Sequence, residues 1–313
     1  MPNAFISLIV DDITQCNLID NRSKIFELID EFIPITIDIK FNKMTRSRWL
    51  KTSMRELIKG DILYIDNDTI IAEDLSSIND FEGDIAAILD DHRYLSEYEK
   101  YRPSRFREVK RMFKVRNFDN KFDFQIYFNG GILFFRDTKI SYDFFKEWHR
   151  LWLHCFELDL YSDQPSLNQA NYNLGKPIRI LNGIWNCQLM HDGSLQYIHD
   201  SKILHYFATH VHEKFFLLAN NEYIELIKRT GYIDDKIKKM LNNPKSQFAA
   251  NTRIMLIDSS YREFYDSATC GAVKRIYQSK FGIFIEFFLL KIKKYFFTPL
   301  RKKIYSKKNI VYI

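Results

Sequence analysis

Apolar and polar positions alternate before residue 70 in a way that predicts strands and helices in turn. Apolar residues spaced three and four apart predict helices, and short apolar or alternating runs predict strands. The predicted elements are a strand at 4–10, a helix at 22–32, a strand at 35–39, a helix at 45–58 and a strand at 62–65. Gly60, just past the second helix, is a typical helix stop. This alternating order predicts an α/β fold with a parallel sheet.

The strand at 62–65 runs directly into Asp66-Asn67-Asp68. Two carboxylates this close cannot both be buried without a partner, because an unpaired buried carboxylate costs several kcal/mol. A hard divalent cation such as Mg²⁺ or Mn²⁺ satisfies them, and it commonly binds substrate phosphates as well. The alternative is an ordinary Asx-type turn. In open α/β sheets ligands bind at the carboxyl ends of strands, which is where this acidic pair falls.

Further elements follow after residue 80. They are a buried strand at 84–89, a strand at 124–135, an aromatic helix at 142–157, a helix from 162 or 163 to about 175 and a strand at 202–207. Asn129-Gly130-Gly131 interrupts the second of these strands and predicts a bulge or a close approach to the backbone. Residues 93–121 are polar, basic and weakly periodic, and we interpret them as a mobile excursion over the sheet edge that acts as a lid.

Several polar residues have a structural and a functional interpretation. Asp90 closes a predicted strand, either as a second acidic site or as a plain turn. Asp163 is the N-cap of the following helix on the structural interpretation. His205 stands near the end of an apolar strand, where most histidines are hydrogen-bonded core residues. The helix at 45–58 has a basic row on one face, either solvated or facing an anion, formed by Arg48, Lys51 and Arg55.

The composition is that of a globular protein with a full core: 313 residues, 46% hydrophobic and 27% charged. The four cysteines have no Cys-x-x-Cys spacing, which predicts neither a zinc site nor a disulfide framework and fits a reducing cytosol. The apolar run at 4–10 has no basic residue before it and two acids after it, so a strand is expected rather than a signal peptide. No apolar stretch reaches the length of a spanning helix.

The positive charge is concentrated in the tail. From residue 274 onward there are eleven Lys and Arg against one acid, a net charge of +10, so the rest of the chain carries −4 of the total of +6. Apolar residues at 281–290 precede and interleave with these lysines, which suits a helix in the headgroup region of an anionic membrane, worth about 1 kcal/mol per basic residue. The alternative is that the apolar face packs on the rest of the protein. The apolar run argues against nucleic acid as a partner.

Taken in order, these motifs resemble the GT-A nucleotide-sugar glycosyltransferases, most closely glycosyltransferase family 8, which includes bacterial lipopolysaccharide galactosyltransferases and glycogenin. The matching stretches are residues 46–51, 66–68, 85–90, 128–131, 163–167, 185–186 and 203–205. The resemblance implies a Rossmann-like GT-A fold of class α/β, with a mixed sheet flanked by helices, at residues 1–215. Residues 216–313 would then form a helical C-terminal appendage that carries the basic, membrane-associating tail.

The resemblance also implies a role for each matching residue. The expected activity is metal-dependent transfer of a hexosyl unit from a UDP-sugar to a surface-glycan or lipid-linked acceptor, with retention of configuration, at the cytoplasmic face of the membrane. The implied Mn²⁺ (or Mg²⁺) ligands are Asp66, Asp68 and His205, and imidazole suits Mn²⁺ better. The implied donor-binding residues are Lys51, Arg48, Asp90, Asn129 and Gly130. The implied catalytic pair under the anomeric carbon is Asp163 and Gln164.

Two departures from the family pattern bear on this expectation. The family's first strand and helix, which hold the nucleoside base, should precede residue 4, so the sequence predicts a sheet that lacks its first βα unit. The Gly and Lys that often follow the metal histidine are not matched, and His210 or Lys214 are the candidates to replace them. The alternative function is an inactive relative that binds a glycan or a partner transferase. Haloacid-dehalogenase phosphatases are disfavoured, because Ile70 stands where they need a Thr.

Overall fold

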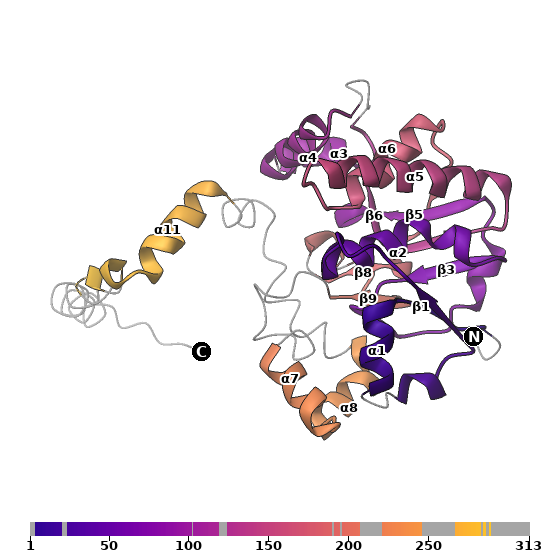
Figure 1. Ribbon diagram of the computed structural model, residues 1–313. Coiled ribbons are helices and arrows are strands. Elements are labelled where there is room, and N and C mark those ends of the chain that lie inside the picture. The colour runs from indigo at the N-terminus through magenta and orange to yellow at the C-terminus, as the bar shows by residue number, and fades with distance from the viewer. Residues whose placement is uncertain are drawn as a thin grey trace, which may run out of the picture. The chain divides into compact units, whose positions relative to one another are not determined.

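The computed structural model describes residues 4–20, 24–101, 103–118, 124–189, 191–194, 196–206, 221–245, 267–282, 284–285 and 288. The chain divides into two compact units, Met1–Ser259 and Ser260–Ile313, which are described separately (Figure 1). The predicted domain boundary at 215/216 lies outside the described residues and stays a prediction, as do the candidates His210 and Lys214. Among the described helices, none combines the length and the apolar content needed to cross a membrane.

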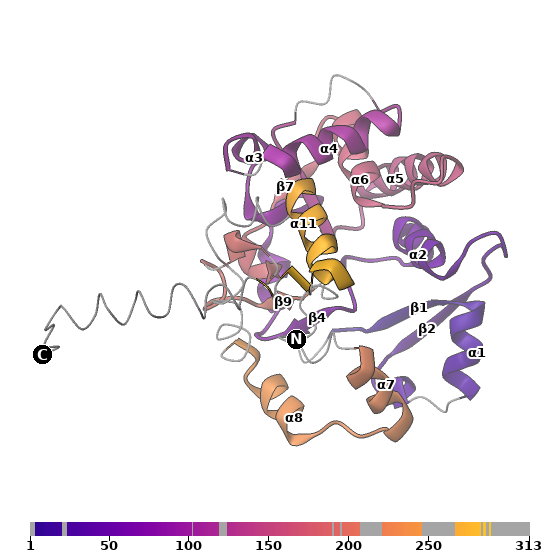
Figure 2. The same cartoon turned by 90° about the vertical axis from the view of Figure 1, so that its left-hand side faces the viewer.

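The first two strands form a small parallel sheet of their own. β1 (Ser7–Asp11) pairs with β2 (Glu31–Ile35), and α1 (Asp12–Asp20) lies beside them (Figure 2). The helix predicted at 22–32 is wrong: of the described residues 24–32, only η1 (Lys24–Glu27) is helical, and the strand predicted at 35–39 comes earlier as β2. None of the residues of α1, all of them described, is buried. The helix therefore has no apolar stripe that periodicity could detect.

The central sheet has four strands in the order β3-β6-β5-β7. β3 (Ile62–Ile65) and β5 (Ile85–Leu89) both run antiparallel to β6 (Phe128–Phe135), while β7 (Ile178–Ile180) runs parallel to β5. The mixed sheet implied by the resemblance is confirmed, and the all-parallel sheet inferred from element order is wrong. β6 is buried over its whole length, because its side chains alternate between two hydrophobic clusters on opposite faces of the sheet.

Five helices contribute to the larger cluster, on one face of the central sheet (Figure 1). They are α2 (Lys43–Leu57), α3 (Leu95–Tyr101), α4 (Pro103–Val115), α5 (Lys139–Glu157) and α6 (Gln164–Asn173). The aromatic helix predicted at 142–157 is confirmed as α5, with Thr138 as its N-cap. The lid expected at 93–121 is wrong, because α3 and α4 are packed into this cluster through Tyr98, Phe106 and Phe113.

The strand that follows the triplet Asp66-Asn67-Asp68 belongs to a third sheet. Its order is β4-β9-β8, formed by β4 (Thr69–Ile71), β8 (Cys187–Gln188) and β9 (Ile203–His205). β4 runs antiparallel to β9, and Thr69 stands opposite His205. Short 3-10 turns connect the strands at η2 (Ser76–Asp80), η3 (Asp90–His92), η4 (Gly183–Trp185) and η5 (Asp192–Ser194). This pairing places the end of β9 beside the start of β4.

The described residues after 216 form helices and short non-helical connections. α7 (Asn221–Thr230) and α8 (Asp235–Asn242) belong to the first unit. The second unit contains α11 (Ala268–Gln278) and further helical residues at 280–282, 284–285 and 288. Most of the basic tail, from residue 289 onward, lies outside the described residues.

Candidate active site

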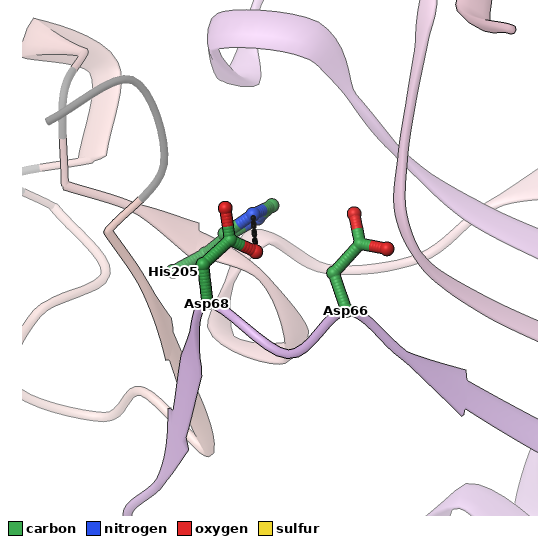
Figure 3. A group of neighbouring side chains, drawn as sticks. All are labelled: Asp66, Asp68 and His205. Atoms are coloured by element: carbon green, nitrogen blue, oxygen red, sulfur yellow. Dashed lines mark hydrogen bonds and ion pairs between the residues drawn. The ribbon is translucent and has the colours of Figure 1, made fainter. Parts of the chain in front are cut away.

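The triplet Asp66-Asn67-Asp68 joins two sheets. Asp66 directly follows β3 in the central sheet, and Asp68 directly precedes β4 in the third sheet (Figure 3). The Asp66 N–H donates to the carbonyl of Gly131 at 2.8 Å, and the Asp68 carbonyl accepts from the Tyr206 N–H at 3.0 Å. Because both ends of the turn are anchored to neighbouring strands, the two carboxylates are held on one short, fixed segment.

His205 is brought to this acidic pair by the β4–β9 pairing. Its side chain is 3% exposed, and its Nε2 lies 3.1 Å from Oδ1 of Asp68 (Figure 3). One ligand atom from each of Asp66, Asp68 and His205 can be chosen so that all three lie within 4.8 Å of one another. His205 is thus a buried residue with polar partners, as its structural interpretation expects, and its ring also faces the acidic pair.

The donor set fits a divalent cation. Two carboxylates and one imidazole are ligands that Mn²⁺ accepts readily and Mg²⁺ less so. Burial raises the pKa of Asp68, but His205, the Asp68 backbone and Lys51 together outweigh burial, so the pKa is lowered and the carboxylate is ionised at neutral pH. The His205 ring is tightly packed against Gly131, since a Cβ added at Gly131 would lie 2.2 Å from Cε1 of His205. Only glycine at this position allows the ring to face the acidic pair.

Gly131→Ala is therefore expected to displace the His205 ring and to lower Mn²⁺ affinity about tenfold or more, a loss comparable to that of removing a partner of a metal ligand. Gly130→Ala is the matched control, because its Cβ would meet Lys51 Nζ at 3.5 Å and Asp163 at 3.7 Å, which are ordinary contacts. Calorimetric titration with Mn²⁺ checks the pair. Equal affinities for the two variants would contradict the placement of His205 at the cation.

The glycine pair forms the predicted bulge in β6. Ala87 pairs with Leu133 while the next residue, Ile88, pairs with Asn129, so the register shifts across Gly130 and Gly131. The Gly131 N–H turns to donate to Oδ1 of Asn129 at 2.9 Å, and its carbonyl accepts from Asp66. The bulge thus directs polar backbone groups of an otherwise buried strand toward the site.

Lys51 lies between two carboxylates. Its Nζ is 3.2 Å from Oδ1 of Asp66 and 3.3 Å from Oδ2 of Asp163, and the Tyr64 hydroxyl also donates to Asp66. Burial disfavours the ammonium, but the two carboxylates outweigh burial and raise the pKa of Lys51. Arg48 completes the group, with Nε 3.1 Å from Oδ1 of Asp163. The basic row on α2 faces protein carboxylates, and its interpretation as a solvated row is wrong.

Asp163 stands at the N-cap position of α6, yet its carboxylate makes no cap hydrogen bond to the described helix backbone. It binds Arg48 and Lys51 instead. Burial raises its pKa, but these two cations outweigh burial, so the pKa is lowered and the group is a carboxylate. Next to it, the amide nitrogen of Gln164 is buried and has no hydrogen-bond partner among the residues that the structure describes. A buried unpaired donor is costly and is typical of a ligand-binding position.

Asp90 is held by a residue that the sequence analysis missed. Its Oδ2 accepts from Arg105 at 3.1 Å, and its Oδ1 accepts from Nδ2 of Asn129 at 3.3 Å. Burial would raise the pKa of Asp90, but Arg105 outweighs it and lowers the pKa to about 2. Arg105 lies on α4, inside the segment interpreted as a lid, and nothing distinguishes it in sequence from the other basic residues there.

The predicted site residues thus form one connected group. Asp66, Asp68 and His205 meet at the candidate cation site, Lys51 links Asp66 to Asp163, and Arg48 binds Asp163. Asn129 joins Asp90 to the same region through the bulge that contains Gly130. The role assigned to each residue by resemblance stays a prediction.

The chain is similar to solved glycosyltransferase structures. It is 16% identical to the bifunctional glycosyltransferase WbbM, with a TM-score of 0.42, over 66% of this chain and 41% of that one. It is 13% identical to the galactosyltransferase LgtC solved with donor and acceptor sugar analogues, with a TM-score of 0.40, over 75% and 99%. It is 18% identical to the glycosyltransferase GlyE of Streptococcus pneumoniae TIGR4, with a TM-score of 0.41, over 72% and 55%.

The chain therefore spans less than two thirds of the length of WbbM and of GlyE. No protein-family model and no curated protein sequence matches it. The three solved structures are glycosyltransferases, the class that the ordered motifs resemble.

Proposed function

We propose that this chain is a metal-dependent glycosyltransferase that moves a hexosyl unit from a UDP-sugar to a surface-glycan or lipid-linked acceptor, with retention of configuration. The observation that carries the proposal is the meeting of Asp66 and Asp68 with His205, a residue 137 positions downstream of Asp68. An Asx-type turn needs no such partner. Asp163 and Gln164, which the resemblance assigns to catalysis, are linked to the same site through Lys51.

The charges of the site favour a diphosphate only when a cation is bound. The carboxylates Asp66, Asp68, Asp90 and Asp163 are accompanied by Lys51, Arg48 and Arg105, which leaves a net charge of −1. A divalent cation changes this to +1. Donor binding should therefore depend on the metal, because the protein alone presents the wrong sign to a phosphate group.

The charge and the hydrogen bonds of each side chain determine the role that we propose for it. A divalent cation held by Asp66, Asp68 and His205 would neutralise charge on the departing nucleoside diphosphate. Asp163, ionised and buried, stabilises positive charge that develops at the anomeric carbon, and low local polarity strengthens that interaction. The unpaired amide N–H of Gln164 donates to an oxygen of the bound sugar. Asp90, held by Arg105 and Asn129, accepts from sugar hydroxyls.

The test is to incubate the protein with Mn²⁺ and a panel of UDP-sugars and to measure released UDP, with a chelator as the control. We expect Mn²⁺-dependent release with at least one donor. Mn²⁺-dependent UDP binding without release would favour the alternative, an inactive relative that binds a glycan or a partner transferase. If neither release nor Mn²⁺-dependent binding is observed, the proposal is wrong for this chain.

The tail is proposed to bind the anionic inner face of the membrane and so to bring the site to a lipid-linked acceptor. In the second unit, large apolar side chains are solvent-exposed at Val273, Ile276, Phe281, Phe284 and Phe288. Phe281→Asp is expected to weaken flotation with vesicles containing anionic lipid, and the control Ser279→Asp to leave it intact. Binding that is equally strong on neutral vesicles, or absent from both, would contradict this prediction.

A further inference from the structure

Asn129 has an amide whose orientation is set by two groups of fixed character. Its Oδ1 faces the Gly131 N–H at 2.9 Å, and a backbone N–H can only donate. Its Nδ2 faces the Asp90 carboxylate at 3.3 Å, which is ionised and can only accept. Both contacts require the same orientation, so the oxygen of Asn129 points toward the bulge and toward the next amide, that of Asn186.

Asn186 takes its orientation from Asn129. The residue is completely buried and follows η4. Its Nδ2 donates to Oδ1 of Asn129 at 3.0 Å, which leaves its own Oδ1 facing Nδ1 of His205 at 2.8 Å. An amide oxygen can only accept, so Nδ1 of His205 must carry the hydrogen. In the neutral ring, Nε2 then carries no hydrogen and presents its lone pair toward Asp68.

With Nδ1 of His205 protonated, the contact between His205 and Asp68 favours a bound cation. Nε2 of the neutral ring and Oδ1 of Asp68 are both acceptors, and they lie 3.1 Å apart. Two acceptors at this distance repel unless a positive ion or a proton lies between them. Metal-binding histidines commonly donate their other N–H to a fixed acceptor, which sets the tautomer and directs the ring.

We propose that Asn186 is a positioning residue: the Asn129–Asn186 amide pair selects the Nδ1–H tautomer of His205 and directs Nε2 at the cation. The inference rests on the metal site of the proposed function. It adds that the orientation of His205, the metal-binding residue, depends on Asp90, the proposed sugar-binding carboxylate. Asp90, Asn129, Asn186 and His205 form one continuous hydrogen-bonded series. All four residues are at most 6% exposed, so solvent has little access to the series.

The first measurement is the tautomer of His205 in the unaltered protein without metal, read from ¹⁵N chemical shifts of the ring nitrogens at a pH where the ring is neutral. We expect Nδ1 to be protonated and Nε2 to carry no proton. The Nε2–H tautomer would overturn the proposal outright. This readout needs neither a folded variant nor a bound cation, so it remains decisive if the proposed metal site fails.

The second measurement compares Asn186→Leu with Asn186→Asp. Leu removes the acceptor opposite Nδ1, and we expect loss of the single tautomer and a 10–100-fold fall in Mn²⁺ affinity, followed by electron paramagnetic resonance. Asp keeps an acceptor there, so we expect it to preserve the tautomer. If Asn186→Leu folds and retains both the tautomer and the affinity, Asn186 is only a packing residue and the proposal is wrong. Absence of Mn²⁺ binding by the unaltered protein would instead refute the proposed function.

Discussion

Asp68→Asn is expected to abolish Mn²⁺-dependent binding of UDP. The substitution preserves the size of the side chain and a polar contact to His205, but it removes the negative charge from the ligand that lies 3.1 Å from the imidazole. A direct ligand should matter more than an outer partner of a metal ligand, whose loss costs about 10–100-fold in affinity. Binding of UDP measured by calorimetry, with Mn²⁺ and with a chelator, checks the expectation.

The matched control is Asp80→Asn, an exposed change of the same chemistry at the end of η2. It should leave Mn²⁺-dependent UDP binding intact. If Asp68→Asn binds UDP as the parent does, with the same dependence on Mn²⁺, then the acidic pair is not the donor site. The proposed mechanism would then be wrong, although the fold would be unaffected.

Lys51→Met is expected to lower the free energy of unfolding by about 3–5 kcal/mol, the usual cost of removing one partner from a buried ion pair. Lys51 is 5% exposed and its ammonium contacts two carboxylates, those of Asp66 and Asp163. Methionine preserves the length of the side chain but leaves both acids without this cation. Urea denaturation in the absence of metal measures the loss.

The same variant should bind Mn²⁺ more tightly than the parent. Lys51 competes with a cation for Asp66, because its Nζ lies within 3.3 Å of both carboxylate oxygens. Mn²⁺ should therefore restore part of the stability lost by Lys51→Met. A loss below about 1 kcal/mol would show that the cluster is solvated rather than buried.

The fold could be predicted where one face of an element is consistently buried. α2 and α5 were placed within a few residues because their apolar positions recur at helical spacing, and β3 and β5 because short apolar runs are buried. α1 escaped detection, since it buries no residue. The packing of α4 was missed although Phe106, Val109 and Phe113 recur at helical spacing and are buried, because the many basic residues between them are typical of a solvated segment.

The sequence by itself determined which chemistry is available: an acidic pair after a buried strand, a glycine pair that forces a bulge, an Asp-Gln pair at a helix start and a histidine in a late strand. Local order is sufficient for these features, because strand ends and turns depend on neighbouring residues. Tertiary structure alone decided which of them meet. The pairing of Thr69 with His205, the contact of Arg105 with Asp90 and the link from Asn129 through Asn186 join residues far apart in the chain. Such contacts follow from strand register and packing, which leave no periodic signal in the sequence.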